Sequence, residues 1–284
     1  MATRNNDALF LDTSIQIARF VHRPEIQDSI ARRLASHEVI VSGLVVRQEF
    51  KRRLLKKAAF YLLKQLNERK SFEKVRRHVA DSLPQPLQRL KCICLQILNT
   101  VDEQDTDVDR TDRARLWLRD LIKNGTATAE ACLTTLNEAS GCGCARQPVI
   151  EKKKFDQYDF GVDRCSKMGS NCEIRRFLED NRDLLGRFLK HIQALSTGDG
   201  GKSDELAKAE QFILDFFANP GAVNDRDPCD SVGDLLIAIE SAGCGWMYTM
   251  NLKESRHLSD VLRQSLVYRP PNSDNEEVVY EPND

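Results

Sequence analysis

Three acidic side chains stand in segments from which an α/β protein would bring them to one place: Asp12, Glu49 and Asp234. Asp12 ends an apolar run, Glu49 lies about two turns into a helical pattern after a second run, and Asp234 lies one turn into a helix that precedes a third. Clustered carboxylates repel one another unless a cation neutralises them, and oxygen ligands suit Mg²⁺ or Mn²⁺. The pattern therefore indicates a divalent-metal site.

Each of these acids also has a purely structural explanation. Asp12 stands where a residue would cap the helix that follows it. Glu49 is followed at i+3 and i+4 by two arginines, the spacing of an exposed ion pair. Asp234 stands three residues after Ser231, the spacing of a capping box. For each residue both explanations remain open from the sequence.

Short apolar runs at 8–12, 38–42 and 246–249 are the elements that would position the acids. Such runs are typical of strands buried on both faces of a parallel sheet, and helical patterns alternate with them, which predicts an α/β fold. Ligands of parallel sheets bind beyond the carboxyl ends of the strands. Polar residues that follow these runs are candidates for the same edge: Thr13, Ser42, Thr249 and Asn251.

A long span of helical spacing separates the second run from the third. Its segments between about residues 84 and 218, including AEACLTTLNEA, carry apolar residues three to four apart. The end of the chain from Pro270 holds five acids, no bases and three prolines, a composition typical of disorder. We therefore expect one α/β domain built from residues 1–66 and 226–268, a large α-helical insertion at 67–225, and a disordered acidic tail at 269–284.

Charge is balanced over the whole chain but not along it. The formal net charge is only −1, so any nucleic-acid site must be local. Between residues 47 and 77 there are twelve Lys and Arg against three acids. This stretch is either a phosphate-binding surface or a solvated helix face. Its candidate substrate-binding residues are Arg52, Arg53, Lys56, Arg76 and Arg77.

The segments LFLDTSI, VSGLVVRQEF and GDLLIAIESAGCGWMYTMNLKESRHL resemble, in order and context, the three acidic motifs of the PIN-domain nucleases. The resemblance covers roughly residues 7–60 and 228–268. It implies a Rossmann-like α/β/α fold with a small central parallel sheet. It also implies metal-dependent hydrolysis of phosphodiester bonds, most often in RNA, with Asp12, Glu49 and Asp234 as catalytic and metal-binding residues.

The resemblance departs from the family pattern after the late strand. The family often has Thr-x-Asp there, whereas this chain has Thr249-Met250-Asn251, as some toxin-type members do. Asn251 would then bind the metal or a metal-bound water, or Glu254 would supply the missing charge. Asp230 is either a helix cap or an outer carboxylate near the metal.

The resemblance implies an endoribonuclease that uses Mg²⁺ or Mn²⁺. The alternative is a non-catalytic RNA-binding or protein-scaffold module in which Asn251 marks a degenerate site. The chain is about twice the size expected of a minimal toxin-type domain, which favours a stand-alone or defence-associated ribonuclease over a simple toxin. Besides RNA, an antitoxin-like protein inhibitor and a second copy of the chain are candidate partners.

The nine cysteines raise a separate possibility. Cys142, Cys144, Cys165 and Cys172 provide the four thiolates of a structural Zn²⁺ site, although their spacing is unusual. The alternative is a set of ordinary reduced thiols on a polar loop. The first residues, MATRNNDALF, lack the basic start and apolar stretch typical of a secretory signal, and no apolar run approaches the roughly 18 residues needed to cross a membrane. We therefore expect reduced cysteines in a cytoplasmic protein with no membrane partner.

Overall fold

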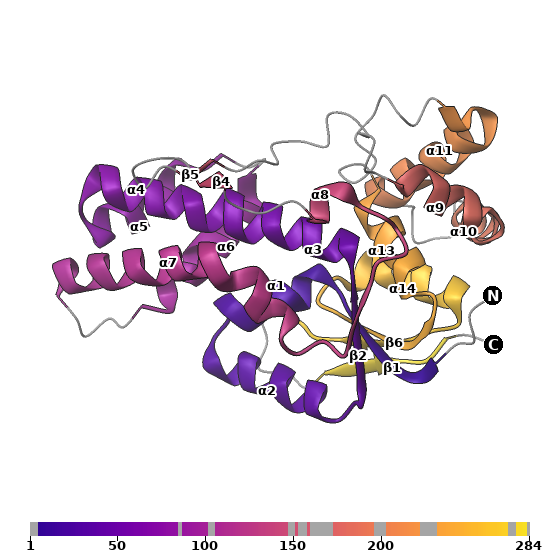
Figure 1. The fold of residues 1–284 in the computed structure, drawn as a ribbon, viewed down its shortest axis with the longest axis horizontal. Coiled ribbons are helices and arrows are strands. Elements are labelled where there is room, and N and C mark those ends of the chain that lie inside the picture. The colour runs from indigo at the N-terminus through magenta and orange to yellow at the C-terminus, as the bar shows by residue number, and fades with distance from the viewer. Residues whose placement is uncertain are drawn as a thin grey trace.

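A central β-sheet organises the chain in the computed structural model, which describes residues 5–84, 87–101, 106–146, 151–152, 158–159, 173–195, 203–221, 232–271 and 277–282. The sheet has six strands in the order β3-β2-β1-β6-β7-β8 (Figure 1). All neighbouring pairs are parallel except β7 and β8. The strands are β1 (Asn5–Leu11), β2 (Val39–Gly43), β3 (Thr135–Asn137), β6 (Cys244–Thr249), β7 (Ser265–Tyr268) and β8 (Val278–Tyr280). The predicted α/β class and its three apolar strands are confirmed.

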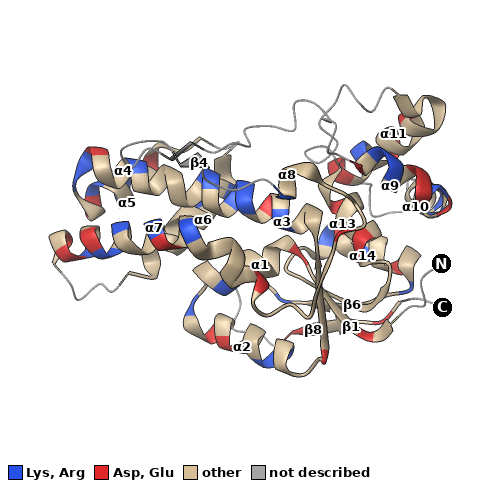
Figure 2. Ribbon diagram, viewed as in Figure 1, with Lys and Arg blue, Asp and Glu red and all other residues tan. Residues whose placement is uncertain are grey.

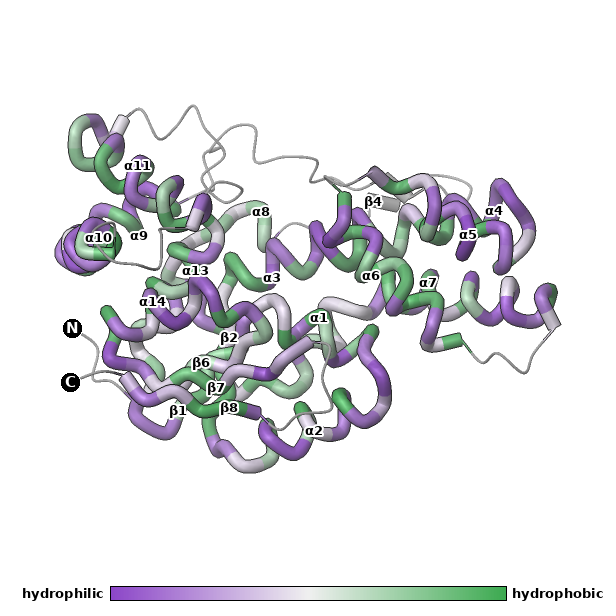
Figure 3. Tube along the Cα trace, turned by 180° about the vertical axis from the view of Figure 1, so that it is seen from behind, coloured by the Kyte–Doolittle hydropathy of each residue, from purple (hydrophilic) through white to green (hydrophobic). Residues whose placement is uncertain are grey.

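Helices cover both faces of this sheet because its strands are apolar on both sides. In β1, Leu9 and Leu11 belong to one hydrophobic cluster, and Ala8 and Phe10 belong to another. The first cluster includes residues of α1 (Thr13–Val21) and α2 (Pro24–Ala35). The second includes residues of α3 (Leu44–Phe50), α13 (Gly233–Ser241) and α14 (Leu252–Leu262). The result is a three-layered α/β/α arrangement, with hydrophobic residues concentrated on the strands (Figure 3).

A helical arm extends from the sheet (Figure 1). Its spine is one continuous run in which α3 passes into the π-helix η1 (Lys51–Phe60) and then into α4 (Tyr61–Arg69). The buried residues Phe50, Leu54, Ala58 and Leu62 recur every four positions, wider than the 3.6 residues of an α-turn. A π-helix accommodates this wider spacing through its i→i+5 bonds. Around the spine pack α5 (Phe72–Ser82), α6 (Gln88–Asn99) and α7 (Asp107–Glu130).

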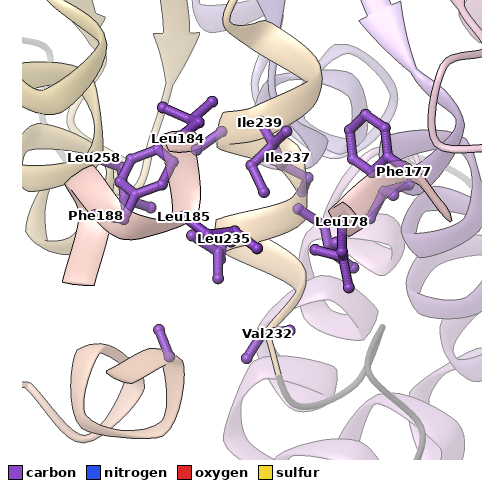
Figure 4. Packing of buried hydrophobic residues seen from close by; sticks show 14 of the residues in the cluster. Phe177, Leu178, Leu184, Leu185, Phe188, Val232, Leu235, Ile237, Ile239 and Leu258 are labelled. Atoms are coloured by element: carbon purple, nitrogen blue, oxygen red, sulfur yellow. The ribbon is translucent and has the colours of Figure 1, made fainter. Parts of the chain in front are cut away.

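Helices α9 (Ile174–Asp180), α10 (Arg182–Leu195) and α11 (Asp204–Ala218) form a second helical group. Figure 4 shows Leu184, Leu185 and Phe188 of α10 close to Leu235 of α13, and Leu178 of α9 on the other side of α13. The short helix α8 (Gly143–Arg146) packs against α3, and β4 (Glu151–Lys152) pairs with β5 (Tyr158–Asp159) apart from the main sheet. No helix in the described part of the chain is long and apolar enough to cross a membrane.

The predicted helical insertion at 67–225 contains a strand of the main sheet. Helix α7 ends at Glu130, and Thr135–Asn137 pairs with β2 as β3, so the helix predicted over AEACLTTLNEA is wrong beyond Glu130. The Thr134 hydroxyl also accepts a hydrogen bond from the Ile40 backbone N–H at 3.1 Å. Pairing satisfies the backbone groups that the edge of β2 would otherwise expose, and this non-local gain outweighs the local helical pattern.

The predicted disorder of the tail is wrong for Val278–Tyr280. These residues form β8 on the edge of the sheet, antiparallel to β7. Glu277, just before the strand, accepts a hydrogen bond from Arg33 Nε at 2.7 Å and another from the Tyr248 hydroxyl. The buried Arg269 lies 3.9 Å from the same carboxylate. An acidic composition predicts disorder only when the acids lack partners, and Glu277 has them.

One buried acid joins the start of α3 to two other elements. Glu240 of α13 accepts hydrogen bonds from the Val45 backbone N–H at 3.2 Å and from the Ser140 hydroxyl. The Asn137 side chain donates to the Glu240 carbonyl at 2.7 Å. A Cβ on Gly43 would lie 1.9 Å from Glu240 Oε2, so the absence of a side chain at residue 43 makes room for this carboxylate.

Glu240 should make the protein less stable as the pH rises. Burial raises the pKa of Glu240 from 4.5 to about 8. The folded state therefore holds the proton more tightly than the unfolded chain. The stabilisation that protonated Glu240 gives to the folded state is complete below about pH 4.5 and is lost as the pH rises through about 8. Each tenfold difference in proton affinity between the folded and unfolded states is worth about 1.4 kcal/mol.

Urea denaturation between about pH 5 and pH 8 tests this expectation. The free energy of unfolding should fall less steeply with pH in Glu240→Gln than in the parent protein. Glu179→Gln is the matched control, because Glu179 lies on the surface of α9 with a side chain 44% exposed. Equal slopes in Glu240→Gln and the parent would contradict the assignment.

Candidate functional site

Asp12 lies at the carboxyl end of β1, beside the end of β6. From β1 the chain builds β2 and β3 on one side, whereas β6 and β7 lie on the other, so the strand order reverses between β1 and β6. Such a switch point is where open α/β sheets bind ligands. Asp12 Oδ1 accepts from the Thr13 N–H at 2.6 Å, and Oδ2 accepts from the Ser14 and Thr249 hydroxyls, each at 2.7 Å. Asp12 therefore caps α1 and is also held by β6.

Glu49 reaches the same region from α3. Its carboxylate is only 4% exposed and accepts a hydrogen bond from Arg53 Nη2 at 2.9 Å. A Cβ on Gly233, the first residue of α13, would lie 2.7 Å from Glu49 Oε1. The ion pair predicted from the i,i+4 spacing is present, but its carboxylate is buried against α13 rather than exposed.

The pKa values of these acids show that they share one electrostatic environment. Burial raises the pKa of Asp234 to about 7, and the charges of Asp12, Glu49 and, more weakly, Glu254 contribute to this rise, whereas Arg53 opposes it. Burial likewise raises the pKa of Glu49, Arg53 lowers it and Asp12 adds to the increase. The three predicted acids therefore gather at one edge of the sheet.

Glu254 is a fourth member of this group. It lies in the first turn of α14 with 5% of its surface exposed, and its charge raises the pKa of Asp234. Asn251 is close by in the chain: its backbone N–H donates to Thr249 Oγ1 at 2.9 Å, and it begins α14 without a side-chain cap. Asp230 and Ser231 lie outside the described residues, so neither the outer carboxylate nor the capping box is tested.

The donor set suits a hard divalent cation, although the acids are not packed tightly around one point. Asp12, Glu49, Asp234 and Glu254 offer only oxygen, the ligand type of Mg²⁺ and Mn²⁺. Within the described residues, the only group of three or more metal-binding side chains whose ligand atoms all lie within 4.8 Å of one another is elsewhere. The carboxylates are therefore more widely spaced than one ion bound directly to three of them would require.

The predicted hydroxyl groups are buried rather than open to a substrate. Ser42 Oγ donates to the Leu11 carbonyl at 3.1 Å and so ties the ends of β2 and β1 together. Thr249 is fully buried and holds Asp12. The buried Thr13 hydroxyl lies near the Glu49 carboxylate and lowers its pKa, without meeting full hydrogen-bond geometry. Of these hydroxyls, that of Thr249 positions an acid directly, and that of Ser42 fixes the strand end that precedes Asp12.

The predicted basic residues fall into two groups. Arg52, Arg53 and Lys56 lie on η1 just beyond Glu49, and the charges of the two arginines lower the pKa of Glu49. Arg76 and Arg77 lie on α5, in the arm that extends away from the sheet (Figure 1). Figure 2 shows basic residues along the helix that continues from α3.

The proposed zinc site falls largely outside the described residues. Cys142 is buried just before α8 and Cys144 is half-buried within it, whereas Cys165 and Cys172 lie outside the described part of the chain. The four-thiolate site is therefore not tested.

Sequence reasoning missed two residues that shape the acidic site. Ser14 donates to Asp12 and accepts from the Met250 N–H at 2.9 Å, which joins α1 to the loop after β6. Its position two residues after Asp12 was the available signal. Gly233 leaves room for Glu49, but nothing in the sequence indicates which side chain faces that glycine.

Comparisons of the chain with protein-family models, with curated proteins and with solved structures give no significant match. The function must therefore be inferred from the geometry and chemistry of the acidic site itself.

Proposed function

We propose that the protein is a metal-dependent endonuclease with a PIN-like, Rossmann-like domain, acting on RNA. The observation that carries the proposal is the group of carboxylates at the switch point of the sheet, in which Asp12, Glu49 and Glu254 are buried and Asp234 is half-buried. The charges of the first three each raise the pKa of Asp234. Proteins rarely bury several acids together without a cation to balance them. RNA is the expected substrate because the sequence motifs resemble a family that cuts RNA most often.

Each residue has a defined role in this proposal. Asp12, Glu49 and Asp234 would hold the metal partly through bound water, because their carboxylates are too widely spaced for all three to bind one ion directly. Glu254 would supply the charge that Asn251 lacks. Bound Mg²⁺ or Mn²⁺ would lower the pKa of a water and stabilise the charge that develops on the phosphate. Arg53 offsets part of the repulsion by pairing with Glu49. Arg52 and Lys56, farther along the same helix, lie where they would attract the phosphate backbone.

Asp12→Asn should abolish most of the activity while preserving the fold. The amide keeps one acceptor oxygen for the Thr13 N–H, and its NH2 group can donate to the Ser14 and Thr249 hydroxyls, which can also accept. The metal-binding charge is lost, so we expect cleavage of a single-stranded RNA with Mn²⁺ to slow by at least about 100-fold. Asp180→Asn is the control, because Asp180 is a surface residue of α9 with a side chain 69% exposed. If the parent cuts no RNA, or Asp12→Asn cuts as fast as the parent, the nuclease proposal is wrong and a non-catalytic RNA-binding module becomes the better description.

Gly233→Ala should damage the site more than the fold. The new methyl group would push against Glu49 Oε1, the movable end of a side chain, so the carboxylate should shift at little cost in stability. We expect weaker Mn²⁺ binding and cleavage slowed by about tenfold or more. Gly186→Ala is the matched control, because a Cβ at Gly186 of α10 would meet nothing within 4 Å. The control should raise stability by up to about 1 kcal/mol and leave cleavage unchanged. Normal Mn²⁺ binding and cleavage in Gly233→Ala would contradict the assigned place of Glu49.

The two groups of basic residues should differ in their dependence on RNA length. Arg76 and Arg77 lie on the arm, so their replacement by Ala should weaken the binding of a long RNA and leave the cleavage of a short oligonucleotide unchanged. The slope of log affinity against log salt concentration should become shallower by up to about two, one for each lost phosphate contact. An unchanged affinity and slope for long RNA would mean that these arginines belong to a solvated helix face.

A further inference from the structure

Three side chains of types that bind metals meet where the second helical group packs against the α/β domain. His191 lies on α10, and His257 and Asp260 lie on α14. One ligand atom from each residue lies within 4.8 Å of the other two, and the rings of His191 and His257 have centroids 6.0 Å apart. The i,i+3 spacing of His257 and Asp260 places both on one side of α14.

The chemistry of this group differs from that of the acidic site. Two imidazoles and a carboxylate form a ligand set typical of Zn²⁺, in which an open fourth position is filled by water. Ligand atoms bound to one Zn²⁺ lie at most about 4 Å apart, since each bond is about 2.1 Å long. The observed separations therefore require at most a small adjustment of the side chains.

One nitrogen of the group lacks a partner within the described part of the protein. His191 Nε2 is buried and makes no hydrogen bond with any described residue. A buried polar atom without a partner costs free energy, and a metal or a bound water would remove that cost.

The position of the group suggests what a metal would do there. Helices α10 and α14 pack against each other, with Leu184, Leu185 and Phe188 of α10 in the same hydrophobic cluster as Leu258 of α14 (Figure 4). We infer that His191, His257 and Asp260 form a transition-metal site, best suited to Zn²⁺, that fastens the second helical group to the α/β domain. The inference stands whether or not the acidic site is a nuclease centre.

Cobalt provides a direct test, because Co²⁺ takes the place of Zn²⁺ and its visible absorption reports its ligands. Full-length protein freed of metal with a chelator should develop, on addition of Co²⁺, the intense d–d spectrum of a four-coordinate site with nitrogen and oxygen ligands, which six-coordinate Co²⁺ at the acidic site would not give. Saturating Zn²⁺ should displace the four-coordinate Co²⁺ and raise the melting temperature by about 5 °C or more. His191→Ala should lose both effects, and so should the milder variant Asp260→Asn.

Two controls separate this site from the others. His78→Ala changes a histidine on α5 in the helical arm and should bind Co²⁺ like the parent. Asp12→Asn should also keep the Co²⁺ spectrum, even if it abolishes RNA cleavage, so that failure of one proposal is distinguishable from failure of the other. The inference is overturned if Zn²⁺ does not stabilise the parent protein. It is also overturned if His191→Ala gives the same Co²⁺ spectrum as the parent at the same Co²⁺ concentration. Strong sulfur-to-cobalt charge-transfer bands would also overturn it, because they would place the metal on cysteines.

Discussion

Repulsion among carboxylates gathered at the switch point of the sheet, three buried and one half-buried, is the constraint on which the rest of the structure depends. Asp12, Glu49, Asp234 and Glu254 come from four different segments, and only part of their charge is balanced by Arg53. Such a group persists only if the surrounding fold is rigid enough to prevent the acids from moving into water. Three hydrogen-bond donors fix the Asp12 carboxylate, and one of them belongs to β6. The rigidity of the site is thus supplied by the pairing of β1 with β6.

The helices that carry Glu49 and Asp234 are held together by a further buried acid, Glu240. Glu240 holds the start of α3 through the Val45 N–H and holds the segment after β3 through Ser140, so α3, α13 and that segment meet at one buried carboxylate. Glu240 lies on the same helix as Asp234, and Val45 lies one turn before Glu49. The contact that fixes the scaffold therefore also fixes the relative position of two of the acids. Hydrogen-bond donors of the protein already satisfy Glu240, so a cation at this edge would bind the neighbouring acids instead.

The sequence was most informative where structure depends on local pattern. Apolar runs predict β1, β2 and β6. The sequence also predicts that Asp12 and Thr249 share an edge, and the structure has the Thr249 hydroxyl donating to Asp12. The sequence was least informative where pairing is non-local: β3 carries a helical pattern, and the strand after Glu277 has the composition of a disordered tail. In both cases the deciding partner, Ile40 or Arg33, lies more than 90 residues away in the chain. The site residue Gly233 was missed for the same reason, since its role depends on Glu49 across the fold.

The two helical groups differ in how they connect to the acidic edge. The arm is continuous with the helix that carries Glu49, and its first turns form a π-helix, a conformation often found at functional sites. Because the arm and Glu49 lie on one continuous helix, a change in the packing of the arm would move the Glu49 carboxylate directly. The second group touches the domain by packing, with α9 and α10 against α13 and α14, the helices of Asp234 and Glu254. Hydrophobic packing alone lets two helices slide past each other, whereas a polar contact that joins one side chain from each helix prevents this sliding. His191 and His257 lie at that contact, and His257 is one turn from Glu254 on α14, so whatever fixes the two rings together also limits the movement of an acid in the site.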